Sequence, residues 1–118
     1  MKRLSHVLAL VLIAGALVVT SSALAGEQPL KTDDDLVSAI QANTPEKHQE
    51  IAAWYKAKAA DESSQAEQHR KMSKAYLGTK AAYNEQMSKH CDEQVALHEQ
   101  LAASYSKMAA EHEAAARK

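Results

Sequence analysis

The chain has 118 residues, with 14 Lys and Arg against 15 Asp and Glu, one cysteine and no phenylalanine. This near-neutral balance excludes the basic surface typical of nucleic-acid-binding domains, and a single cysteine excludes an internal disulfide. No Gly-rich phosphate loop, nucleophile elbow or His-Glu-x-x-His motif occurs. With no nucleophile–base pair either, we expect a protein that is not an enzyme.

Residues 1–25 are predicted to form a signal peptide. Lys2 and Arg3 give a basic start, an apolar run covers about residues 8–19, and Ala23-Leu24-Ala25 matches an A-x-A cleavage site. The run is shorter than the roughly 20 residues that span a bilayer, so cleavage after Ala25 is preferred to an uncleaved anchor. We expect a periplasmic or secreted chain with no membrane span and, without Lys2 and Arg3, 12 basic and 15 acidic side chains.

Residues 26–44 are predicted to be an extended leader and a short packing helix. Thr32 is a helix cap with Asp35 as its capping-box partner, and Asn43 is expected to end the helix. The alternative, an acidic metal loop at residues 33–35, is disfavoured because consecutive side chains in a helical first turn point in different directions.

Residues 45–118 are predicted to form a long helical hairpin, which makes the fold class all-α. Thr44 and Pro45 give a strong start to a helix over about 45–77. Gly78 is expected to close it in the left-handed conformation, and Thr79 to cap a second helix over about 80–117. Two long helices joined by a short turn lie antiparallel.

Large aliphatic residues are scarce in this chain. After Gly26 they are Leu30, Leu36, Val37, Ile40, Ile51, Leu77, Val95, Leu97 and Leu101. A core this poor predicts that a second element or a second chain covers it. We therefore expect a homodimer, completed as a helical bundle by self-association, or a protein partner in the cell envelope.

A heptad seam runs along both predicted helices. Its positions are His48, Tyr55, Glu62, His69 and Tyr76 on the first helix, and Met87, Cys91, Gln94, His98, Leu101, Tyr105, Met108 and His112 on the second. The segments 48–55 and 98–105 also resemble each other as an internal repeat. A turn centred near Lys80 makes facing residue numbers sum to about 160. This register pairs His48 with His112, Tyr55 with Tyr105, Glu62 with His98 and His69 with Cys91.

Residues on and beside the seam near the turn are candidate metal ligands: His69, Met72, Met87, His90 and Cys91. Imidazole, thioether and thiolate suit a soft ion such as Cu(I), or Zn(II) with the His and Cys alone. Second-rank candidates are Glu62 with His98 and His48 with His112. Cys91 has the alternatives of a buried thiol or an inter-chain disulfide, and a non-covalent haem held by His and Met is a weaker possibility.

The first hypothesis is therefore a non-enzymatic exported helical bundle that binds Cu or Zn through inward His, Met and Cys side chains. The alternative is a structural or interaction coiled coil of the cell envelope. In that alternative, the His layers set the register of the helices or respond to acid, because His titrates near pH 6.5.

Overall fold

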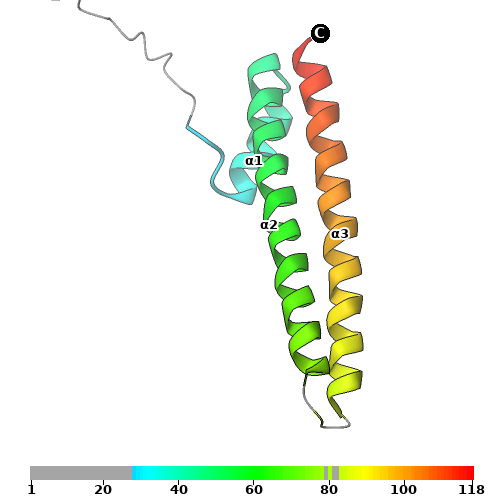
Figure 1. The fold of residues 1–118 in the computed structure, drawn as a ribbon. Coiled ribbons are helices and arrows are strands. Elements are labelled where there is room, and N and C mark those ends of the chain that lie inside the picture. Colours follow the sequence, from blue (N-terminus) through cyan, green and yellow to red (C-terminus); the bar gives the residue numbers. More distant parts are fainter. Residues whose placement is uncertain (1–27, 79, 81–82) are drawn as a thin grey trace, which may run out of the picture.

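A computed structural model describes residues 28–78, 80 and 83–118; the predicted signal peptide lies outside these residues. The described chain folds into three helices: α1 (Asp33–Ala42), α2 (Pro45–Leu77) and α3 (Tyr83–Ala116). The all-α prediction is confirmed. The two long helices lie side by side and antiparallel, and α1 lies against α2 at the end of the hairpin far from the turn (Figure 1).

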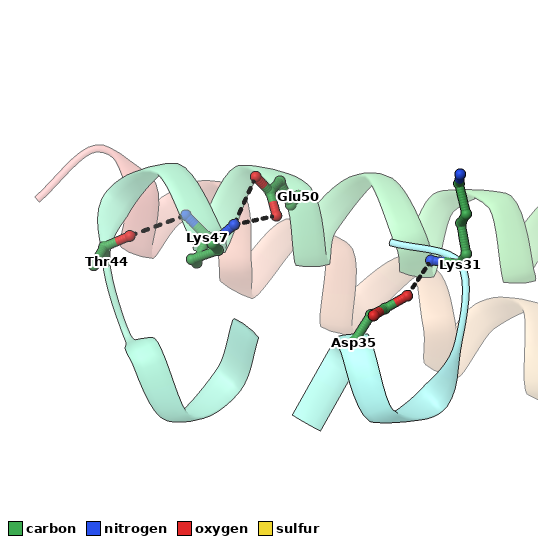
Figure 2. Close-up of polar contacts among 5 residues, drawn as sticks. All are labelled: Lys31, Asp35, Thr44, Lys47 and Glu50. Atoms are coloured by element: carbon green, nitrogen blue, oxygen red, sulfur yellow. Dashed lines mark hydrogen bonds and ion pairs between the residues drawn. The ribbon is translucent and has the colours of Figure 1, made fainter. Parts of the chain in front are cut away.

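The first turn of α1 has the capping box that the sequence predicts. The Asp35 amide donates to the Thr32 hydroxyl (3.1 Å), and the Asp35 carboxylate accepts from the backbone N–H of Thr32 (2.9 Å). Figure 2 shows that the backbone N–H of Lys31 donates to the same carboxylate. These donors hold the Asp35 pKa below its usual value. At the other end Asn43 is left-handed (φ 50°, ψ 45°) and ends the helix.

The start of α2 is also fixed locally. The Lys47 amide donates to the Thr44 hydroxyl (3.2 Å), and Pro45 occupies the first position, where no amide hydrogen is needed. The Lys47 ammonium donates to both oxygens of the Glu50 carboxylate at 3.1 and 2.9 Å (Figure 2). Two residues therefore separate α1 from α2, and the chain reverses sharply between them.

The prediction for Gly78 was wrong. Gly78 keeps right-handed angles (φ −72°, ψ −4°), and its amide donates to the Lys74 carbonyl at 3.1 Å, so the helical hydrogen bonding continues to this residue. The next helix, α3, begins at Tyr83 rather than at about residue 80. The predicted cap Thr79 lies outside the described residues.

On α2 the seam follows the prediction. His48, Glu62, His69 and Tyr76 are half-buried and Tyr55 is buried. Between them lies a second set of positions that are all small and buried: Ala52, Ala59, Ala66 and Ser73. The two sets alternate at steps of four and three residues, which is the spacing of a coiled-coil seam.

On α3 three of the eight predicted seam positions were wrong. Cys91, His98, Tyr105 and His112 are buried or half-buried as expected, and Met108 is half-buried against the core. Met87, Gln94 and Leu101 are exposed, and the next residue along the chain, Ser88, Val95 or Ala102, is buried or half-buried instead, as is Ala109 after Met108. Both sets fit the four–three spacing, so periodicity did not separate them. The smaller set faces the partner helix because small side chains allow the two backbones to approach more closely.

The apolar core lies at the open end of the hairpin. Ile51, Tyr55, Ala39 and Ala109 form its buried centre, with Ile51 the one large side chain that is fully buried among the described residues. Packed around them are Leu30, Leu36, Trp54, Tyr105 and Met108. The expected role of α1 as a packing arm is confirmed, since Leu36 and Ala39 come from it.

The buried Ala66 gives a direct test of the small-residue layers. Ala66 is 1 % exposed, so Ala66→Leu forces a larger side chain between the helices and should lower the free energy of unfolding by about 1–3 kcal/mol. Urea denaturation followed by circular dichroism measures this. The matched control, Ala60→Leu at an exposed position of the same helix, should stay within about 0.5 kcal/mol of the parent chain. Equal effects would show that the seam is not closely packed.

Candidate functional site

The inward-facing histidines form cross-helix layers. At the open end, Nδ1 of His48 lies 2.8 Å from Nδ1 of His112, with the ring centroids 5.1 Å apart. Nε2 of His48 lies 3.0 Å from Oδ1 of Asn43. The residue that ends α1 thus orients an imidazole of α2, which in turn meets one from α3. The predicted pairing of His48 with His112 is confirmed.

The protonation of this layer follows from its geometry. The amide oxygen of Asn43 accepts, so Nε2 of His48 carries a hydrogen and Nδ1 of the neutral ring is an acceptor. Nδ1–H of His112 then donates to it. If both rings were charged, two N–H groups would point at each other across 2.8 Å. Burial, and then the nearby His48, lower the pKa of His112, while Glu111 acts in the opposite direction.

The Tyr layer adjoins the His pair. The rings of Tyr55 and Tyr105 stack with centroids 5.9 Å apart, and Tyr55 also stacks on His112 at 5.8 Å. This is the Tyr–Tyr pairing that the register predicts. The two aromatic layers make one continuous stack, which is the reason that the His48–His112 pair is partly shielded from water.

The middle of the hairpin carries a carboxylate–imidazole pair. Nδ1 of His98 lies 2.5 Å from the Glu62 carboxylate, and both side chains are 21 % exposed. Nδ1–H of His98 donates to Glu62, which leaves Nε2 as the free nitrogen. The predicted pairing is confirmed here too. This arrangement can hold a proton or orient an imidazole.

His69 lies against the same pair. Its ring stacks on that of His98 with centroids 5.3 Å apart and planes at 16°, whereas the register had placed it opposite Cys91. Nδ1 of His69 is buried and has no hydrogen-bond partner among the described residues. Cys91 is a buried free thiol. Among the described residues, His69 is therefore the seam histidine whose unpartnered ring nitrogen is buried.

The other predicted ligands near the turn lie outside the seam. Met72 and Met87 are 41 % and 36 % exposed, and His90 is an exposed side chain whose Nδ1 lies 3.5 Å from the Glu93 carboxylate on its own helix. Within residues 28–78, 80 and 83–118, no group of three or more His, Cys, Asp or Glu side chains has the geometry to hold a metal ion.

Sequence reasoning missed a further polar layer. The hydroxyls of Ser73 and Ser88 are hydrogen-bonded at 2.8 Å in the buried seam. Their residue numbers sum to 161, so the register assumed from the sequence already placed these two serines opposite each other. The choice of Met87 over Ser88 as the seam residue concealed it. The missed role of Asn43 had no such signal, because it depends on how α1 docks.

No protein-family model, curated protein or solved structure matches this chain. No described helix has both the length and the apolar character needed to cross a membrane. The site must therefore be interpreted from its own geometry.

The His48–His112 layer predicts a loss of stability in mild acid. The folded chain protonates His112 less readily than the unfolded chain does, so its contribution is complete above about pH 6.5 and is lost as the pH falls below that value. Asp35 and Glu113 have lowered pKa values, so their stabilising effect is lost only in more acidic solution. The melting temperature should fall between about pH 7.5 and 5.5.

Two variants assign this effect. His112→Gln should flatten the dependence of the melting temperature on pH, whereas His90→Gln, which removes an exposed histidine on the same helix, should leave it unchanged. A slope that survives in His112→Gln would show that another group is responsible.

The Glu62–His98 pair should couple strongly. A double-mutant cycle of Glu62→Ala and His98→Ala, measured by urea unfolding, should give a coupling free energy of about 1–3 kcal/mol because the pair is half-buried. The exposed Glu85–Lys89 pair, 3.0 Å apart on one helix, serves as the control and should give about 0.3–0.5 kcal/mol. Equal values for the two cycles would contradict a structural role for the buried layer.

Proposed function

We propose that this chain is a non-enzymatic structural or interaction module of the cell envelope, exported by residues 1–25. Its polar layers set the register of the hairpin and make its stability sensitive to pH. The role is that of a rigid rod with a defined surface, which presents side chains to a protein partner.

The observation that supports this proposal is how the seam histidines use their ring nitrogens. His48 and His112 bond to each other, and His98 bonds to Glu62. Each contact joins α2 to α3 across the seam, and each works in only one alignment of the two helices. Satisfied polar layers of this kind select one register at some cost in stability.

Transition-metal binding is the second candidate, and His69 supports it. A buried imidazole nitrogen without a partner costs free energy, and a metal ion with Cys91 and a methionine thioether would offset that cost. Met72, Met87 and His90 would complete this set only if their exposed side chains turned inward. The candidate ions remain Cu(I) and Zn(II).

A metal titration separates the two proposals. The reduced mature chain is mixed with Zn(II) or Cu(I), and its stoichiometry and melting temperature are measured against a chelator-treated sample. The interaction proposal expects no stoichiometric binding and an unchanged melting temperature. Tight binding would instead stabilise the fold by about 4 kcal/mol at a thousandfold excess over the dissociation constant.

Variants identify the site in the second case. Stoichiometric binding that is lost in His69→Ala/Cys91→Ser, and kept in His48→Ala/His112→Ala, would replace the interaction proposal with a metal site near the turn. Binding lost in the second variant instead would place the ion at the open end.

A further inference from the structure

The two flanks of the hairpin seam differ in chemistry. One flank carries ion pairs from α2 to α3, Lys56 with Glu113 and Arg70 with Glu99. Each of these four residues comes directly after a seam residue in the sequence. The opposite flank, one residue before the small seam positions, carries large apolar side chains instead: Ile51 and Met72 on α2, and Met87, Leu101 and Met108 on α3.

The arm α1 covers only the open end of this apolar flank. Leu30 and Leu36 pack there around Ile51, and Met108 belongs to the same cluster. Toward the turn the flank is bare. We define the bare flank as Met72, Met87, Gln94, Leu97 and Leu101; its apolar members are 36–52 % exposed. Shallow hollows lie on it beside Leu97 and Leu101 and beside Met72.

The outer face of α1 is a second uncovered apolar surface. Val37 and Ile40, both on α1, are 50 % and 48 % exposed. Figure 1 shows α1 beside the open end of the hairpin, whereas the residues of the bare flank lie nearer the turn. One chain thus has two unpartnered apolar surfaces at opposite ends of one flank.

The two surfaces lie at matching distances from the middle of the hairpin. Ile51, under α1, and Met72, on the bare flank, are each about 16 Å along the helix from Asp61 at the centre of α2. A twofold axis through the middle therefore exchanges the two surfaces. It sets Val37 and Ile40 of one copy on Met72 and Met87 of the other, and Leu97 opposite Leu101 of the second copy.

We propose that this chain forms a twofold antiparallel homodimer in which each α1 covers the bare flank of the other copy. The interface continues the packing of α1 on its own hairpin. Between the apolar ends this flank carries Lys58, Gln65 and Gln94. The twofold axis sets Lys58 of one copy opposite the neutral Gln65 of the other, so no like charges are brought together there, and the ion-paired flank stays in solvent. The inference rests on the exposed surfaces and does not depend on the proposed role of the His layers.

Sedimentation of the mature chain over a range of micromolar concentrations provides the first test. The parent chain should have twice the mass of one chain. Leu97→Glu places carboxylates at the centre of the interface and should give a monomer with unchanged helical content. Ala103→Glu, on the ion-paired side of α3, is the matched control and should remain a dimer. A monomeric parent chain, or a Leu97→Glu variant that stays dimeric, would overturn the proposal.

Cysteine pairing tests the orientation. In a Cys91→Ala background, chains with Ile40→Cys are mixed with chains carrying Met87→Cys and oxidised. Within one chain, the level of Ile51, which α1 covers, and the level of Met72, on the bare flank, are about 31 Å apart along α2. This is far beyond the roughly 7 Å limit for a disulfide, so a bridge must join two copies. Mixed disulfide dimers should predominate. Dimers formed mainly by Ile40→Cys with itself would indicate a parallel arrangement and contradict the antiparallel one.

Discussion

The close approach of α2 and α3 is the constraint on which the rest of this structure depends. Apart from Val95, every second layer of the seam is built from small residues, such as Ala52 and Ala66 on α2 and Ala109 on α3. Small side chains bury little apolar surface, so the hairpin gains less from the hydrophobic effect than a Leu-rich coiled coil would. What they provide is proximity, which brings the intervening polar side chains of the two helices within hydrogen-bonding distance.

The polar layers follow from that proximity. His48 reaches His112 and Glu62 reaches His98 because the backbones between them are separated by methyl groups rather than isobutyl groups. In a wider seam these groups would take water as their partner instead. The alternation also explains where the core lies. Large apolar side chains are excluded from most of the seam, and Ile51 is buried because α1 covers the flank beside it.

The same constraint moves apolar side chains to the surface. Leu101 and Met87 had appeared to be seam residues, and their exposure is a direct result of the smaller neighbours taking the inner positions. A surface of this kind on a short chain typically marks an interaction site. One side of the hairpin is therefore apolar and exposed, whereas on the other side Arg70 and Glu99 form an ion pair in solvent. The two sides of the hairpin therefore differ in chemistry along its length.

The sequence by itself determined the helices and their pairing. Local signals placed the caps at Thr32 and Thr44, and the spacing of seam residues gave the register that joins His48 to His112, because capping and periodicity depend on neighbours along the chain. Only the tertiary structure decided between Met87 and Ser88 as seam residues, since both fit the same period and the choice depends on how closely the backbones pack. It also decided that His69 stacks on His98 and that Asn43 orients His48, because those contacts depend on rotamers and on the docking of α1.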